Sequence, residues 1–289
     1  MIIGIISYLP NDVVLRSKRL DKHQKQLELF KTLNVPIYIV AQNYKQEELS
    51  KIPGINYYCI DRGIGPANAR NIMLQTFYNS NEDFMMLCDD DMVFYDYYGI
   101  RDFFNELITN PNKFINDLDY IRGVMASKVP FKQTVYNQRL NLTHYVFEDR
   151  DTIGTTALAI VKNFKKYYNK EIYYEDLNVS EGNGYEDKDF CCKLKINNIK
   201  THVLDTFILK AFNYTDNSTL FNTYEDRMNV HSNNNSKIYE KYKDLFDNNI
   251  LKRCYKSSKV AIKRCNDIVI PDNLIPDKLK LKKSLFDLI

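Results

Sequence analysis

The first 90 residues alternate short apolar segments with amphipathic ones, and few folds accommodate this alternation. Residues 2–7 and 36–41 are rich in β-branched side chains, which is typical of strands buried on both faces. Between them, 13–33 spaces its leucines among charged residues as an amphipathic helix does. The pattern continues with a predicted strand at 56–60, a helix at 66–77 and a strand at 84–88. We therefore expect an α/β fold with a mainly parallel sheet, flanking helices and right-handed crossovers.

The second half of the chain is less regular. We expect strands at 120–135, 153–161 and 202–210, a helix at 186–197 and helical structure over 236–265. Six cysteines without a C-x-x-C pair predict free thiols in a reducing compartment. No apolar run approaches the ~20 residues that a membrane-spanning helix needs. We expect a soluble, cytoplasmic protein without a transmembrane segment.

Three aspartates, Asp89, Asp90 and Asp91, come directly after the predicted strand at 84–88. Ligands of parallel sheets bind beyond the carboxyl ends of the strands. Carboxylates crowded at such an end repel one another unless a cation such as Mg²⁺ or Mn²⁺ lies between them. Because alternate side chains of a strand share a face, Asp89 and Asp91 can converge on one ion, while Asp90 points elsewhere, towards a ribose hydroxyl. The alternative interpretation is a solvated acidic loop.

A second acidic segment, Gly184-Tyr-Glu-Asp-Lys-Asp-Phe190, opens the predicted helix at 186–197. The helix dipole favours carboxylates there, and either Glu186 or Asp187 can be placed as a general base. An ordinary well-capped acidic helix start is the alternative.

Three further residues gain meaning from these two segments. His231 is weak evidence alone, but imidazole suits Mn²⁺ as an additional ligand. Arg70 and Asn71 lie on the helix that follows the glycine-rich turn at Gly63 and Gly65, a place that can serve an anionic ligand.

In this order, the strand–helix alternation, G-x-A-x-A-R-N, the aspartate triplet, G-Y-E-D-x-D-F and the later histidine resemble GT-A glycosyltransferases. The resemblance covers roughly residues 1–245 and is nearest to the family-2-like and β-1,4-galactosyltransferase groups. It implies a catalytic domain over 1–245, with a nucleotide-binding half (1–100) and an acceptor-side half (101–245). A basic helical extension over 246–289 would follow.

The resemblance also implies roles for single residues. Asp89 and Asp91 would bind Mn²⁺ or Mg²⁺ and the diphosphate of a nucleoside-diphosphate sugar, with His231 as the late metal ligand. Asp187, or alternatively Glu186, would deprotonate the acceptor hydroxyl. Arg70 would belong to the nucleotide side. The resemblance further implies inversion at the sugar carbon. The sequence departs from the galactosyltransferase pattern at Lys188, which interrupts the acidic run.

The net charge of +3, from 40 basic and 37 acidic residues, hides an asymmetry. Residues 251–289 carry ten Lys or Arg against four Asp, whereas the rest of the chain is slightly acidic. A basic tail and an asparagine-rich, AT-rich-genome composition resemble bacteriophage enzymes that glycosylate hydroxymethylated DNA, which would place the protein in the host cytoplasm. The acceptor is then DNA or, alternatively, a cell-surface or lipid-linked glycan.

Two other classes of protein stay open. A sugar nucleotidyltransferase also uses metal-binding aspartates, but it has a glycine-rich basic loop after its first strand, which residues 6–10 lack. A non-catalytic module that binds a glycan or nucleotide sugar would not need the carboxylate of Asp187.

Overall fold

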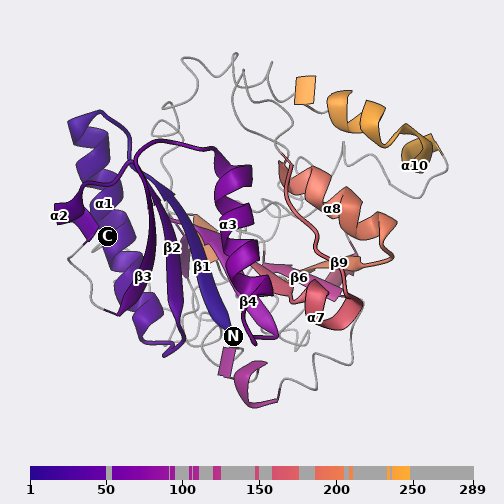
Figure 1. Ribbon diagram of the computed structural model, residues 1–289, viewed down its shortest axis with the longest axis horizontal. Coiled ribbons are helices and arrows are strands. Elements are labelled where there is room, and N and C mark those ends of the chain that lie inside the picture. Colours follow the sequence, from indigo (N-terminus) through magenta and orange to yellow (C-terminus); the bar gives the residue numbers. More distant parts are fainter. Residues whose placement is uncertain are drawn as a thin grey trace, which may run out of the picture.

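The computed structural model describes residues 1–49, 54–90, 92–94, 104–105, 107–110, 120–124, 147–149, 158–175, 186–204, 208–210, 233–234 and 236–247. Its elements follow the predicted strand–helix alternation (Figure 1). The strands are β1 (Ile2–Tyr8), β2 (Ile37–Gln42), β3 (Ile55–Ile60), β4 (Phe84–Asp89), β5 (Met92–Phe94), β6 (Tyr120–Val124), β7 (Phe147–Asp149), β8 (Leu158–Lys162), β9 (Lys200–Leu204) and β10 (Ile208–Lys210). The helices are α1 (Val13–Lys31), α2 (Gln46–Leu49), α3 (Pro66–Tyr78), α7 (Phe164–Tyr168), α8 (Glu186–Ile196) and α10 (Lys243–Asp247), and residues 236–241 are also helical.

One sheet runs through both halves of the chain in the order β3-β2-β1-β4-β8-β6-β9-β7. The first four strands are mutually parallel, as expected for a Rossmann-like α/β fold. Beyond β4 the sheet is mixed, because β8 runs antiparallel to both of its neighbours and β7 runs antiparallel to β9. Strands β6 and β9 are parallel.

The two faces of the parallel strands pack against different helices. Alternate side chains of β1, such as Ile3 and Ile5, pack with Leu27 and Phe30 of α1. The intervening ones, such as Ile6, pack against the other face, with α3 and α8. In Figure 1, α1 and α3 lie on opposite sides of β1, β2 and β3. Both faces of β1 and β4 are therefore covered, which explains their uninterrupted apolar sequences.

The helix starts are set by local chemistry. Asp12 caps α1 by accepting a hydrogen bond from the backbone N–H of Leu15 at 2.9 Å. Gly65 precedes α3 at φ 81°, a left-handed conformation that favours glycine, and Pro66 occupies the first helical turn. The glycine-rich turn is thus a helix entry that places Arg70 one turn inside α3.

The predicted strand at 202–210 was wrong as a single element. The structure forms β9 within the large sheet, while β10 pairs antiparallel with β5 in a separate two-stranded sheet. The two segments are divided because they take different partner strands. Only 120–124 of the strand predicted at 120–135 is described. Of the basic extension predicted over 246–289, all but the first two residues lie outside the described part.

The four cysteines in the described part, Cys59, Cys88, Cys191 and Cys192, are free thiols, as predicted. No described helix combines the length and the apolar character required to cross a membrane.

Candidate functional site

The carboxyl ends of β1, β2 and β4 meet at one edge of the sheet. The three strands are adjacent and parallel, and in their register Ser7 lies opposite Ala41 while Ile6 lies opposite Asp89. The segments that follow these strands therefore emerge together. This is the edge at which α/β sheets bind ligands.

The adjacent carboxylates Asp89 and Asp90 lie on opposite faces of the sheet. Along β4, Leu87 packs on the α3 side and Cys88 on the α1 side. The alternation continues beyond them, so that Asp89 pairs with Arg70 of α3 and Asp90 approaches α1. This divergence agrees with the prediction from strand periodicity, although the third aspartate, Asp91, lies outside the described residues.

Arg70 joins the two acidic motifs. Its Nη2 donates to Asp89 Oδ1 at 2.9 Å, and its Nη1 donates to Glu186 Oε1. The Arg70 side chain is buried, with 3% of its surface exposed. Burial lowers the pKa of Arg70, but Asp89 and Glu186 more than offset this, and the pKa lies above its ordinary value. A planar guanidinium can bridge two carboxylates in this way, whereas a lysine ammonium offers no fixed fork.

An aromatic pair supports the guanidinium from α8 and the preceding segment. The Arg70 Cζ atom lies 5.6 Å from the centre of the Tyr174 ring. The Tyr174 ring in turn stacks on Phe190 of α8, with 4.1 Å between ring centres and 11° between planes. A cation over an aromatic face is stabilised, more so when it is shielded from water.

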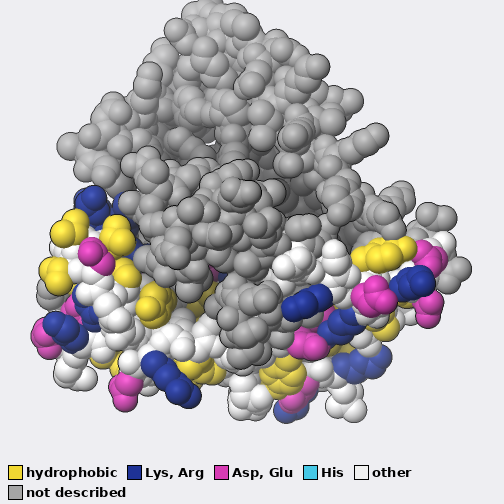
Figure 2. Space-filling model, turned by 90° about the horizontal axis from the view of Figure 1, so that it is seen from above, with side chains coloured by type: hydrophobic (Ala, Val, Ile, Leu, Met, Phe, Trp, Pro, Cys, Tyr) yellow, Lys and Arg dark blue, Asp and Glu magenta, His cyan; other side chains and the backbone are white. Residues whose placement is uncertain are grey.

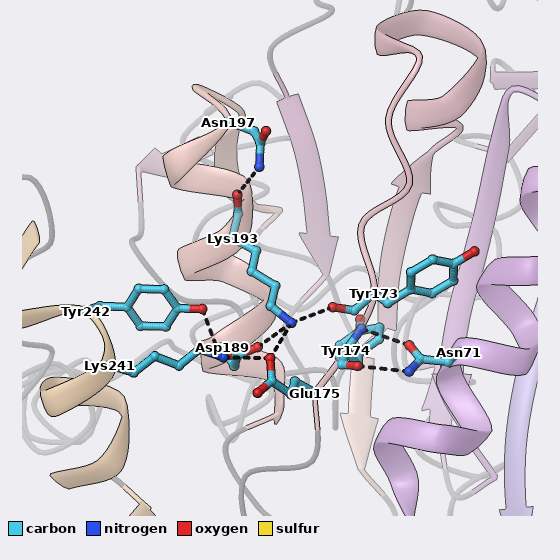
Figure 3. A network of polar contacts seen from close by, with 9 residues as sticks. All are labelled: Asn71, Tyr173, Tyr174, Glu175, Asp189, Lys193, Asn197, Lys241 and Tyr242. Atoms are coloured by element: carbon cyan, nitrogen blue, oxygen red, sulfur yellow. Dashed lines mark hydrogen bonds and ion pairs between the residues drawn. The ribbon is translucent and has the colours of Figure 1, made fainter.

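The segment containing Tyr174 is bound to α3 at several successive residues. Figure 3 shows the contact between Asn71 and Tyr174. The amide of Asn71 donates to Tyr174 O at 2.9 Å and accepts from Tyr174 N at 2.8 Å. Tyr173 donates to Gln75 Oε1 at 2.5 Å. Tyr78 donates to Ile172 O at 2.7 Å. One face of α3 thus pairs with an extended segment about 100 positions away in the chain, and the Asn71 amide is used in this contact.

Asp189 anchors α8 to the following helical residues, as Figure 3 shows. Its side chain is fully buried, and Oδ1 accepts from Lys241 Nζ at 2.7 Å and from the Tyr242 hydroxyl at 2.8 Å. Lys193 Nζ lies 2.9 Å from Oδ2. Glu175 completes the cluster through Lys193 and Lys241. This carboxylate therefore has a structural role, although it belongs to the same acidic motif.

Glu186 and Asp187 differ in their surroundings at the start of α8. Glu186 is buried, and burial raises its pKa, with the Arg70 guanidinium acting in the opposite direction. Asp187 is partly exposed, and its Oδ1 accepts from the backbone N–H of Lys188 at 2.7 Å. Both lie in the first turn of α8, where the helix dipole stabilises a carboxylate. Of the two, Asp187 is the more accessible to a substrate.

On the α1 side, Asp90 lies in a buried polar group. Its Oδ2 accepts from Ser7 Oγ at 2.5 Å, and Ser7 Oγ also lies 2.5 Å from the Tyr44 hydroxyl. Close by, Gln26 contacts His23 at 3.2 Å. Burial lowers the pKa of His23, and the charge of Asp90 acts in the opposite direction.

Two of the predicted metal ligands, Asp91 and His231, lie outside the described residues. Within the described part of the chain, no group of three or more His, Cys, Asp or Glu side chains lies close enough together to hold a metal. Of the predicted ligands, Asp89 is described, and its Oδ1 is paired with Arg70.

The sequence patterns did not indicate several residues that lie in or near the site. Ser7 carried a readable signal, because it is the polar residue that ends an apolar strand. Tyr44 and Tyr174 lie in segments without a motif, and their contacts depend on distant parts of the chain.

Figure 2 views one face of the molecule. On its described part, Lys and Arg side chains are interspersed with Asp and Glu side chains. A mixed surface of this kind does not mark a polyanion-binding site.

No known family profile matches the sequence. No curated protein matches it either. Several solved structures are similar. Staphylococcus aureus TarS 1–349 shares 15% identity with a TM-score of 0.46, and the match covers 83% of this chain but 66% of that one, just under two thirds.

A nucleotidyl transferase from Methanothermobacter thermautotrophicus shares 8% identity with a TM-score of 0.41, covering 81% of this chain and 97% of that one. The galactosyltransferase LgtC, solved with donor and acceptor sugar analogues, shares 12% identity with a TM-score of 0.34, covering 70% and 73%. At these values we base the function on the chain's own residues.

Proposed function

We propose that the protein is a metal-dependent glycosyltransferase that moves a sugar from a nucleoside-diphosphate sugar, in particular a UDP-sugar, to an acceptor hydroxyl. The observation that carries this proposal is the pair of bonds from Arg70 to Asp89 and to Glu186. The aspartate run that follows β4 and the acidic start of α8 are far apart in sequence, yet they meet across one buried guanidinium at the ligand-binding edge.

In the proposed reaction, Asp89, Asp91 and His231 would hold Mn²⁺ or Mg²⁺. When bound, such an ion neutralises the negative charge that develops on a departing diphosphate. Asp90, Arg70 and Asn71 were predicted on the nucleotide side. Arg70 is better suited to fixing Asp89 than to binding phosphate directly, since both ends of its guanidinium contact carboxylates.

Asp187 is the proposed general base. It would take the proton of the acceptor hydroxyl as that oxygen bonds to the anomeric carbon and the bond to the diphosphate oxygen breaks, with inversion at the sugar carbon. Glu186 is less suited to this role, because it is buried and its carboxylate is bound by Arg70. A positioned carboxylate contributes about 10²–10⁴-fold to such a step.

The loop after β1 favours sugar transfer over nucleotidyl transfer. A nucleotidyltransferase needs a loop there whose backbone N–H groups and basic side chains surround a triphosphate. Here Leu9 and Pro10 are buried, and Arg16 is bound to Glu48 and to the carbonyl oxygens of Pro10 and Asn43. The first basic residue after β1 in the sequence is thus engaged within the protein.

The test of the reaction class compares two products. The protein is incubated with Mn²⁺ and a panel of UDP-, dTDP- and GDP-sugars, and separately with nucleoside triphosphates and sugar 1-phosphates. We expect slow release of nucleoside diphosphate from a nucleotide sugar, loss of this release with a chelator or in Asp91→Ala, and no loss in the exposed control Asp21→Asn. Release of pyrophosphate from a triphosphate would instead identify a nucleotidyltransferase. Binding of a nucleotide sugar without turnover would identify a binding module.

The acceptor is a separate proposal. The basic residues that suggested DNA lie in 251–289, outside the described part. Incubation with DNA containing 5-hydroxymethylpyrimidines and with a glycan panel, read by mass spectrometry, separates the two acceptors. Unmodified nucleosides across all donors would remove the DNA acceptor and leave the glycan.

A further inference from the structure

The middle residue of the aspartate run is directed away from the proposed reaction site. Asp90 has 6% of its surface exposed and lies on the α1 side of the sheet, whereas Asp89 faces Arg70 on the α3 side. A buried carboxylate is stable only when it is paired or hydrogen-bonded. Its partners therefore reveal what it does.

Those partners form a chain of hydroxyl groups. Ser7 Oγ donates to Asp90 Oδ2 at 2.5 Å, and the Tyr44 hydroxyl lies 2.5 Å from the same Ser7 Oγ. A serine hydroxyl has one proton to donate. Because Ser7 gives that proton to Asp90, Tyr44 must donate to Ser7. Arg19 Nη2 lies 3.7 Å from the other oxygen of Asp90 and adds a longer-range attraction.

This chain crosses three neighbouring strands at their carboxyl ends. Ser7 belongs to β1, Tyr44 follows β2, and Asp90 follows β4. A second contact fixes the preceding peptide, because Gln26 Nε2 donates to Asp89 O at 2.9 Å. The end of β4 is therefore held from the α1 side at two successive residues, through the backbone of Asp89 and the side chain of Asp90.

We infer that Asp90 is a positioning residue, and that the chain Tyr44–Ser7–Asp90 orients the end of β4 so that Asp89 is presented on the opposite face, towards Arg70. Asp90 does not contact the nucleotide in this arrangement. The inference deepens the proposed function and rests on it, since Asp89 is taken to serve the donor site.

The first test requires no ligand. Urea unfolding is measured for Ser7→Ala, Tyr44→Phe and the double variant. The matched tyrosine control is Tyr173→Phe, whose hydroxyl bonds Gln75 and Glu171 on the α3 side of the sheet. Because Tyr44 acts through Ser7, the double variant should lose clearly less stability than the sum of the two single losses, whereas Tyr173→Phe should add independently to Ser7→Ala. Additive losses of stability for Ser7→Ala and Tyr44→Phe would contradict the inferred series of hydrogen bonds from Tyr44 through Ser7 to Asp90.

The second test separates positioning from contact with the ribose. Binding of UDP and of 2′-deoxy-UDP, each with Mn²⁺, is measured by calorimetry on the folded wild type, Ser7→Ala, Ser7→Thr and Asp90→Asn. We expect Ser7→Ala to weaken both nucleotides equally, by about tenfold, the value of one hydrogen bond to a charged group. Ser7→Thr keeps the hydroxyl and should restore the affinity.

Asp90→Asn should leave the ratio of the two affinities unchanged. Weakening of UDP alone in Asp90→Asn would place Asp90 on the ribose and overturn the inference, as would wild-type affinity in Ser7→Ala. If the wild type binds neither nucleotide, the proposed uridine donor fails, and the unfolding experiment still decides whether the hydroxyl chain exists.

Discussion

Arg70 and Glu186, separated by 116 positions in the chain, form a buried ion pair. Because Arg70 also bonds Asp89, a single side chain on α3 bridges the end of β4 and the start of α8. The two acidic motifs would repel each other without it. The pair therefore connects folding and the proposed chemistry, and this connection can be tested.

Replacement of Arg70 should destabilise the protein and abolish the proposed transfer. Arg70→Leu leaves two carboxylates without their shared cation, and breaking a buried pair typically costs about 3–5 kcal/mol. Arg70→Lys keeps the charge but cannot bridge both partners, so it should lower the unfolding free energy less than Arg70→Leu does. Urea unfolding measures the free energies. Lys25→Met, which removes an exposed ion pair with Asp21, is the control and should cost less than ~1 kcal/mol. Equal effects of Arg70→Leu and Lys25→Met would contradict the bridge.

Asp187→Asn should retain donor binding and lose transfer. If Asp187 is the base, kcat should fall about 10²–10⁴-fold with the donor KM nearly unchanged. Glu186→Gln keeps an oxygen for Arg70 and should retain more activity. Steady-state kinetics on both variants measure the difference. A larger loss of kcat in Glu186→Gln than in Asp187→Asn would assign the base to Glu186.

Removal of Asp189 should loosen the helical residues at 236–247. Asp189→Ala deprives Lys241 and Tyr242 of their shared acceptor, and the expected loss of unfolding free energy is roughly 3–5 kcal/mol. Hydrogen exchange of a peptide from 236–247 should accelerate before the rest of the fold unfolds. As a control, Lys165→Met breaks the exposed pair with Glu171 and should leave this exchange unchanged. Unaltered exchange in Asp189→Ala would mean that the cluster does not hold the helix.

The pair of Arg16 and Glu48 predicts a pH dependence of stability. The hydrogen bonds that Glu48 accepts from Arg16 hold the pKa of Glu48 below its ordinary value of 4.5. A lowered carboxyl pKa gives stability that is present above pH 4.5 and is lost as the pH falls through the still lower pKa of the folded state. Glu48→Gln should therefore lower the unfolding free energy at pH 7 by about 1–3 kcal/mol. The difference from wild type should shrink below pH 4.5, which thermal melts from pH 7 to pH 3 would show. A constant difference over this range would contradict the assignment.

The fold of the first 90 residues could be predicted because each of its elements follows a local pattern. The strands β1, β2 and β4 are uninterrupted apolar runs, and α3 has an entry of Gly65 and Pro66. Opposite directions for Asp89 and Asp90 followed from the two-residue period of a strand. These features need no knowledge of distant residues.

The rest depends on contacts across the chain. That β10 leaves the large sheet for β5 is decided by the partner strands, which a local pattern does not reveal. The hydrogen bonds from Tyr44 through Ser7 to Asp90 can be predicted only when the strand order is already known. Similarly, the sequence offers no sign that the Asn71 amide binds the backbone of Tyr174, 103 positions away.

The pairing of β4 with β8 has a consequence for synthesis and for shortened versions of the protein. Leu87 pairs with Ala159, so β4 has no partner on that side until more than 70 further residues have been made. Until then its apolar strand FMMLCD is an open sheet edge, and open apolar edges recruit other chains. A fragment that stops before residue 158 would contain Asp89 and Arg70, yet we expect it to aggregate. During synthesis, the incomplete chain on the ribosome exposes the same edge, and we expect it to depend on chaperones until β8 has been made.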